Sequence, residues 1–208
     1  MELQSTKTLG GIGALLMVIS PFLAVYSAVL GLVGLILVLI AMKGLADYYK
    51  ENGIFNNALY GVLSTIVGAI VFAVVIFMTL VSFFRDFGLD LDTAWTDPTA
   101  ISQFQFADSA MFDSIIGHAA AIFGSLVILF IFVVVAAIFF RKSLTTLSEK
   151  TGVGLFGTTG LLLLIGAVLT IIAVGAVLIW VAAILLAVAF FSIKTEPTQM
   201  PPPATATT

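Results

Sequence analysis

The stretch TGVGLFGTTGLLLLIGAVLTIIAVGAVLIWVAAILLAVAFFSI, residues 151–193, has no charged side chain in 43 positions. As one straight helix it would rise about 65 Å, which is about twice the ~30 Å hydrocarbon core of a bilayer. It therefore predicts a helical hairpin that crosses a membrane, turns and crosses back. We place its two spans at 153–172 and 176–193, with the bend near residues 173–175.

The composition of the whole chain is typical of an integral membrane protein. Hydrophobic residues make up 61% of the 208 positions and charged residues only 9%, and the mean hydropathy is +1.24. A soluble domain carries about 25% charged residues. The net charge of -3 is too small to indicate a nucleic-acid partner. The absence of cysteine excludes disulfides, thiolate catalysis and cysteine-ligated metal.

The N-terminal region contains a second long run without charge, between Lys7 and Lys43. Its 35 residues again exceed the ~20 that one membrane helix needs. Because Pro21 removes a backbone donor, we expect a break near it and two spans, at 9–24 and 28–45. A cleavable signal peptide is the alternative, since Lys7 precedes an apolar run. That run is far longer than the ~7–15 apolar residues of a signal peptide.

Two further apolar segments in the middle of the chain predict spans at 57–84 and 116–140. A polar segment, 43–57, precedes the first of them. We expect it to form a turn at the membrane surface, with Asn56 or Asn57 capping the helix that follows.

Residues 85–115 form the sizeable polar loop of this sequence, with six aspartates against one arginine. Asp97 followed by Pro98 is a helix-start signal, and the apolar spacing after it predicts an amphipathic helix on the membrane surface. A disordered loop is the alternative. We expect residues 141–150 to form a compact basic loop and residues 194–208 to be a disordered tail rich in proline and threonine.

The distribution of cations predicts the orientation of these six spans, because positively charged loops are retained in the cytoplasm. One side holds seven cations and the other holds Arg85 alone. The seven are Lys7, Lys43, Lys50, Arg141, Lys142, Lys150 and Lys194. The predicted fold class is therefore an all-α integral membrane protein in which residues 1–193 form a single six-helix transmembrane bundle. Helices 1–2 and 5–6 form two tight hairpins, the N- and C-termini are cytoplasmic, and residues 85–115 are external to the cell membrane.

Three segments resemble an archaeal membrane family known as domain of unknown function 996. They are TKTLGGIGALL at 6–16, GLADYYKENGIFNNALYG at 44–61, and GLLLLIGAVLTIIAVGAVLIWVAAILLAVAFFSI at 160–193. The resemblance covers most of residues 6–193, except the acidic loop. It implies an archaeal cell membrane and a family that is not an established enzyme class. It brings no known activity, substrate or catalytic residue.

The chemistry of the spans argues against several classes of membrane protein. They contain no lysine, arginine, aspartate or glutamate away from their ends, which weighs against proton-coupled pumps, voltage sensors and intramembrane aspartyl proteases. Neither HExxH nor GxSxG occurs. We therefore expect no catalytic residue, no cofactor and no metal site.

Three weaker signals have both a functional and a structural interpretation. His118 is either a pH-responsive group or metal ligand, or an interfacial histidine bonded to water or backbone. Asp90, Asp92 and Asp97 either collect a calcium ion or form a solvated acidic loop. Residues 152–157 have the GxGxxG spacing of a dinucleotide site, but no strand is expected before them. We favour the structural interpretation of each.

Two sets of residues are candidates for contacts. Small residues at helical spacing let helices approach closely, and the candidate packing residues are Gly31, Gly34, Gly61, Ser64, Gly68, Gly117, Ala121, Gly124, Gly154 and Gly157. The candidate interfacial or partner-contact residues are Asp47, Tyr48, Tyr49, Asn56, Asn57, Asp97, Asp113 and His118.

Three functional hypotheses follow, all with the lipid bilayer as a partner. The first is a non-catalytic scaffold, assembly or regulatory component that binds another membrane protein or a second copy of itself. The second is a channel or carrier for a small neutral solute, lined by Ser64, Thr65, Thr79, Ser82, Ser125 and Thr170. The third is an interfacial enzyme that uses Asp47, Tyr48, Tyr49 and Lys50, or Asp113 and His118. A polar cavity at mid-depth would favour transport, and a dry bundle would favour the scaffold.

Overall fold

The computed structural model describes residues 2–86, 110–172 and 174–194, and none of these residues lies in a strand. The main helices are α1 (Leu3–Ile19), α2 (Ser27–Tyr49), α3 (Asn52–Asp86), α5 (Ala110–Thr151), α6 (Gly154–Leu169) and α7 (Val174–Phe191). Short 3-10 segments follow α1 (η1, Ser20–Tyr26) and α6 (η3, Thr170–Ile172). Six helices within the described residues are long and apolar enough to cross a membrane. The expected all-helical class is confirmed, and six helices have the length and composition that the expected spans require.

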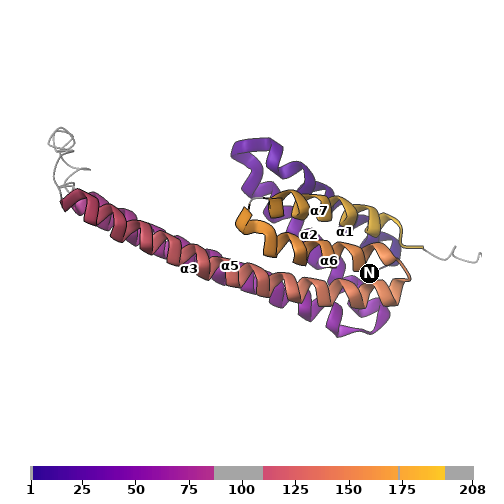
Figure 1. Ribbon diagram of the computed structural model, residues 1–208. Coiled ribbons are helices and arrows are strands. Elements are labelled where there is room, and N and C mark those ends of the chain that lie inside the picture. The colour runs from indigo at the N-terminus through magenta and orange to yellow at the C-terminus, as the bar shows by residue number, and fades with distance from the viewer. Residues whose placement is uncertain (1, 87–109, 173, 195–208) are drawn as a thin grey trace, which may run out of the picture.

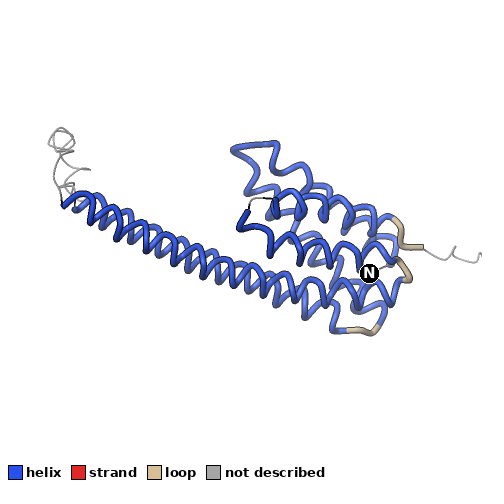
Figure 2. The backbone as a smooth tube through the Cα atoms, in the orientation of Figure 1, coloured by secondary structure: helices blue, strands red, loops and turns tan. Residues whose placement is uncertain are grey.

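The six helices form a closed ring, as the pairs in contact show. α1 packs on α2, α2 on α3, α3 on α5, α5 on α6, α6 on α7, and α7 returns to α1. Figures 1 and 2 show α1, α2, α6 and α7 gathered as one group beside the paired α3 and α5. Each helix therefore has two neighbours and a face that is turned away from the ring.

The α2–α3 turn is formed by Lys50–Glu51 and the α5–α6 turn by Gly152–Val153. Both lie at the same end of the bundle, which we call the polar end. The described ends of the chain meet there too, because the Lys7 Nζ donates a hydrogen bond of 3.1 Å to the Ile193 carbonyl (Figure 1). The α1–α2 hairpin and the α6–α7 hairpin therefore each leave the polar end and return to it. Arg85, at the end of α3, lies at the opposite end, which we call the far end.

The core of the protein is concentrated near the polar end. Phe156 and Phe190 are fully buried, and their rings meet edge to face with centroids 5.3 Å apart. Met42, Leu45 and Ile54, from either side of the α2–α3 turn, are buried around them. Aromatic pairs in this geometry stabilise a core beyond the area that they bury. The packing that fixes the bundle is thus close to its turns.

α3 and α5 are much longer than the other four helices. They contain 35 and 42 residues, against 16 to 23 in the others, and at 1.5 Å per residue they rise about 52 and 63 Å. Figure 1 shows the two running side by side past the far end of the other four helices. We call this part, residues 69–86 and 110–131, the projecting hairpin.

The expectation of a basic loop at 141–150 is wrong, because α5 continues through it to Thr151. Leu144 and Leu147, three residues apart, are buried on one face of that helix. The Ser143 hydroxyl also donates a hydrogen bond to the Ile54 carbonyl. Polar composition suggested a loop, but a minority of apolar residues at helical spacing is enough to bury one face.

The polar segment at 43–57 is also almost entirely helical, contrary to expectation. Only Lys50 and Glu51 lie outside a helix, and Ala46 and Ala58 are buried on either side of them. Asn57 does not cap α3. Its side-chain nitrogen donates to the Gly53 carbonyl, 2.8 Å away, within the first turns of the helix. The extra turns are held by packing, because the start of α3 contacts α5 through Ile54 and Ser143, and the end of α2 contacts α1 through Gly44 and Thr6.

Other boundaries differ where the sequence carries no sharp signal. α5 begins at Ala110, so residues 110–115, the end of the expected surface helix, continue without a break into the span expected from residue 116. The break expected near Pro21 is present as η1. Of the bend expected near 173–175, Val174 and Gly175 begin α7, and residue 173 lies outside the described residues. The rest of the expected surface helix, Asp90, Asp92, Asp97 and the tail from residue 195 also lie outside the described residues.

The α2–α3 turn contains a strained position that leads to a stability prediction. Lys50 has a φ of 54°, in the left-handed region, which costs a residue with a Cβ about 1–2 kcal/mol. We expect Lys50→Gly to raise the free energy of unfolding by about 0.5–1 kcal/mol, after the larger chain entropy of glycine is subtracted. Denaturant titration in detergent micelles, followed by circular dichroism, measures the change.

Lys142→Gly is the matched control for this prediction. Lys142 is also an exposed lysine at the polar end, but it lies within α5. Glycine there should lower the free energy of unfolding by about 1 kcal/mol. Loss of stability in both variants would show that Lys50 is not strained.

Candidate functional site

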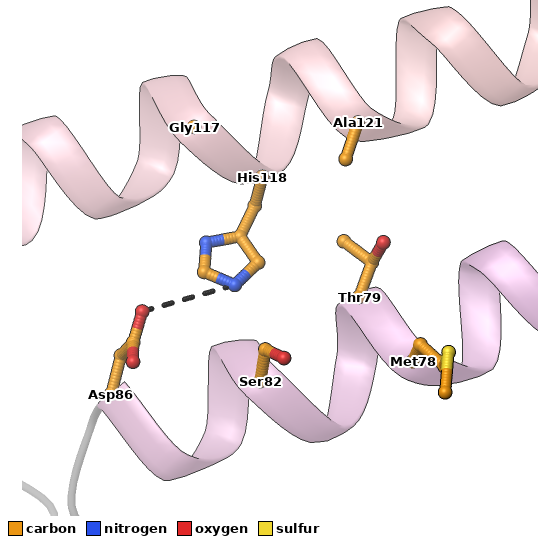
Figure 3. Close-up of a pocket in the computed structure, with 7 residues that line it drawn as sticks. All are labelled: Met78, Thr79, Ser82, Asp86, Gly117, His118 and Ala121. Carbon is orange, nitrogen blue, oxygen red and sulfur yellow. Dashed lines mark ion pairs between the residues drawn. The ribbon is translucent and has the colours of Figure 1, made fainter.

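A shallow groove of about 380 Å³ lies between α3 and α5 in the projecting hairpin (Figure 3). α3 contributes side chains at spacings of three to four residues, which places them on one face, and α5 contributes mainly small residues. The lining consists of Met78, Thr79, Ser82, Asp86, Gly117, His118 and Ala121.

His118 and Asp86 close the groove toward the tip of the hairpin. The His118 Nε2 lies 3.8 Å from the Asp86 Oδ2, with the two side chains 15% and 50% exposed. The Phe83 ring meets the imidazole edge to face, with centroids 5.5 Å apart. A half-exposed pair at this distance is worth little in stability, so it orients the histidine and adds polarity at the groove's end (Figure 3).

The structure shows that His118 lies beside Asp86, a pairing that the sequence did not indicate. The two residues are 32 positions apart, and they meet only through the antiparallel register of α3 and α5. The side chain of Asp113 lies outside the part described. Among the described residues, no group of three or more histidine, aspartate or glutamate side chains could hold a metal ion.

The interfacial candidates at positions 47–49 and 56–57 lie at the polar end, at the opposite end of the bundle from His118. Lys43 Nζ pairs with Asp47 Oδ1 at 3.0 Å and lies 5.4 Å from the centre of the Phe55 ring. The rings of Tyr48 and Tyr49 meet edge to face with centroids 5.0 Å apart. Of these contacts, the one between Lys43 and Phe55 links the end of α2 to the start of α3.

One ion pair links the two turns of the polar end. Lys150 Nζ lies 3.3 Å from Glu51 Oε2, and both side chains are partly exposed. Asn56 is exposed on α3, and Arg141 and Lys142 are exposed on α5. Asp47 is bonded to a lysine of its own helix, so the polar end carries separate surface pairs in place of one gathered cluster.

Four of the candidate packing residues lie where helices touch. A Cβ on Gly34 would come 2.6 Å from the Gly13 carbonyl oxygen, on Gly61 3.0 Å from the Phe140 ring, and on Gly68 2.5 Å from the Phe132 Cβ. Gly157 would meet Ser148 at 3.4 Å. These glycines allow close approach of α1 to α2, of α3 to α5 and of α6 to α5. Ser64, in turn, is half-buried on α3.

The remaining candidate glycines lie on open faces. A Cβ on Gly117, Gly124 or Gly154 would meet nothing within 4 Å, and Gly31 would meet only the Ser20 side chain. Ala121, which lies between Gly117 and Gly124 in the sequence, is exposed and lines the groove. Gly117, Ala121 and Gly124 therefore form an uncovered strip of small residues on α5.

Other glycines in helix contacts were missed. Gly10 and Gly11 lie against the rings of Phe190 and Phe191, and Gly166 lies against Gly175. The three-residue spacing of Gly10 and Gly13 was a usable signal, because small residues one turn apart mark a helix contact.

The second hollow lies at the centre of the ring and has a volume of about 350 Å³. All six main helices contribute to it, and Thr65 is the one lining residue with a hydroxyl. That hydroxyl donates to the Gly61 carbonyl at 3.0 Å. The others are Met17, Leu35, Val38, Met42, Val62, Ile66, Val133, Ala136, Ala137, Phe140, Leu144, Leu163, Ala167, Ile179, Ala182, Ala183 and Leu186.

The hydroxyls expected to line a solute path do not share one cavity. Thr79 and Ser82 lie in the groove of the projecting hairpin, and Thr65 lies in the central cavity. Ser125 donates to the Ile122 carbonyl at 2.7 Å and Thr170 to the Gly166 carbonyl at 2.9 Å, each within its own helix. Their donors are thus used by the backbone.

The ring of six long apolar helices and its apolar centre define an all-helical protein with the dimensions and composition of a multi-pass membrane protein. The chain belongs to the family described as "Protein of unknown function (DUF996)", whose profile matches residues 30–184. It is 33% identical over 199 residues to an uncharacterised protein of Methanocaldococcus jannaschii, covering 94% of this chain and 96% of that protein. No solved structure matches the chain.

Proposed function

We propose that this chain is a non-catalytic scaffold of the cell membrane, which holds another membrane protein against its projecting hairpin. The chain spans the bilayer six times, with the polar end in the cytoplasm and the far end outside, because seven of its eight cations lie toward the polar end. The bundle near the polar end anchors the molecule, and the hairpin presents the binding surface.

The observation that carries this proposal is the uncovered strip on α5. Gly117 and Gly124 would accept a Cβ without meeting any atom within 4 Å, and two residues of the strip, Gly117 and Ala121, line the groove of the projecting hairpin. In lipid, close approach of backbones and interhelical hydrogen bonds drive helix association. A partner helix can approach the strip closely, and the hydroxyls of Thr79 and Ser82 lie beside it to bond with the partner.

The central cavity favours the scaffold hypothesis over the carrier hypothesis. Its lining is apolar except for Thr65, whose hydroxyl is bonded to the backbone, whereas a path for a polar solute needs hydrogen-bonding groups along its length. The polar end similarly supports a structural role. Asp47, a residue considered for interfacial catalysis, pairs with exposed Lys43 one helical turn away.

Gentle purification from the native membrane tests the proposal. The tagged full-length chain is extracted in mild detergent, and companions are quantified by mass spectrometry. A membrane protein should co-purify at a fixed ratio, and Gly117→Leu should reduce its recovery at least about tenfold, since overpacking costs roughly 1–3 kcal/mol and 1.4 kcal/mol is tenfold.

Ala119→Leu is the control for that experiment. Ala119 is exposed on the same helix but is rotated by about 200° from Gly117, so the added side chain points away from the strip. Recovery of the companion should be unchanged. Equal loss in both variants, or a chain that purifies alone and carries a neutral solute across liposome membranes, would refute the scaffold.

A further inference from the structure

The central cavity is closed toward the polar end and open toward the far end. On α2, Met42 is 1% exposed, and Leu35, two turns farther from the polar end, is half-buried. On α3, Val62 is 6% exposed and Ile66, one turn farther, is 48% exposed. α5 repeats the trend from Leu144, which is 2% exposed, to half-buried Val133. Burial therefore decreases along several helices in the same direction, and the cavity has a floor and a mouth.

The mouth of the cavity opens beside apolar surface. The corners of the two short hairpins, at η1 and η3, carry exposed apolar side chains such as Phe22, Val25 and Ile171. α3 and α5 continue past these corners as the projecting hairpin, which exposes Phe77 and Met78 (Figure 1). Anything that enters the mouth must therefore come from an apolar layer.

The chemistry of the lining excludes water and polar ligands. Each buried water needs about two to four polar partners, and the one hydroxyl in the lining, that of Thr65, already donates to Gly61. The volume of about 350 Å³ is within the ~300–1,000 Å³ range of small-molecule sites. It is also about twice the ~150 Å³ of an engineered apolar cavity that binds benzene. The cavity suits a flexible hydrocarbon segment longer than one ring.

We propose that the central cavity binds one hydrocarbon chain of a membrane lipid, which enters from the leaflet at the far end and reaches toward Met42 and Leu144. The head group stays outside the ring, because no polar side chain inside could bind it. The lipid chain fills the space that all six helices enclose, lined on α3 and α5 by residues 62–66 and 133–144. This site is independent of the partner-binding strip on α5, since the two share no residue.

Photo-crosslinking tests the site with a defined probe. The full chain is reconstituted in vesicles of a phospholipid that contain a trace of the same lipid with a diazirine at the end of one acyl chain. After illumination, labelled peptides are mapped by mass spectrometry. Labelling is expected at Met42 and Leu144, which the surrounding lipid cannot touch, and also at exposed Phe77, which serves as the internal reference.

Two α7 variants separate the cavity from the outer surface. Ala183 lines the cavity, whereas Ala176 is exposed. Relative to Phe77, labelling of Met42 and Leu144 should fall at least about fivefold in Ala183→Phe, because the ring occupies the space, and it should be unchanged in Ala176→Phe. If Ala183→Phe does not fold, Leu163→Ala decides, since enlarging the cavity should raise labelling at both deep positions.

Two results would overturn the proposal. The first is labelling confined to exposed residues such as Phe77, with no signal at Met42 or Leu144. The second is deep labelling that neither Ala183→Phe nor Leu163→Ala changes. Failure to recover a protein companion would not change the labelling of Met42 and Leu144, so the scaffold proposal and the lipid-site proposal can be refuted separately.

Discussion

Gly34→Leu should lower the free energy of unfolding by at least about 3 kcal/mol, at the upper end of what overpacking costs. A Cβ at this position would lie 2.6 Å from the Gly13 carbonyl oxygen and 2.9 Å from the Met17 Cγ. The oxygen belongs to the backbone of α1, so relief requires the two helices to separate. Unfolding is followed by circular dichroism during titration with a denaturing detergent.

Gly31→Leu, one turn earlier on α2, provides the matched comparison. A Cβ there would meet only the Ser20 side chain, at 3.4 Å, and Gly31 is half-buried. The replacement gains helix propensity over glycine, worth up to about 1 kcal/mol, so the variant should be at least as stable as the parent. If Gly34→Leu were as stable as Gly31→Leu, the α1–α2 contact would not be as close as the structure shows.

Single-cysteine labelling should give an all-or-none result for the proposed orientation. The chain has no cysteine of its own, so every introduced thiol is unique. In intact cells a membrane-impermeant maleimide should label Arg85→Cys and spare Glu149→Cys, by a ratio of at least about tenfold, because cation-rich ends remain in the cytoplasm. Inverted vesicles should reverse the ratio.

The two positions are chosen so that the probes do not disturb the orientation. Arg85 is the one arginine or lysine toward the far end, and removing it increases the charge asymmetry, while Glu149→Cys leaves every cation in place. Both parent residues are exposed. If both variants were labelled from the same side of the membrane, the chain could not cross the membrane an odd number of times between Arg85 and Glu149. The six-span orientation would then be wrong.

The number of helices could be predicted because charge and length are local properties. An uncharged run of 43 residues cannot cross once and stop, and the same holds for the run that follows Lys7. The lengths of α2, α3 and α5 at the polar end could not be predicted in the same way. Residues such as Leu147 and Ile54 become helical because they are buried against each other's helices, which depends on tertiary packing.

The candidate site was predictable only in part, for a similar reason. The small residues of α5 were visible in the sequence, but which of them lie against a neighbour depends on the rotation of each helix. Gly68 is covered by Phe132, whereas Gly124 is open. The pairing of His118 with Asp86 and the apolar cavity at the centre of the ring arise from register and shape, for which no sequence motif exists.

The unequal lengths of the helices have a consequence for the lipid around the protein. The uncharged part of α3, residues 52–84, rises about 50 Å, while that of α2, residues 27–42, rises about 24 Å. A flat sheet of constant thickness cannot match both flanks at once, and each ångström of mismatch costs a fraction of a kcal/mol. The molecule should therefore act as a wedge that tilts nearby lipids, and it should accumulate where a membrane bends or changes thickness.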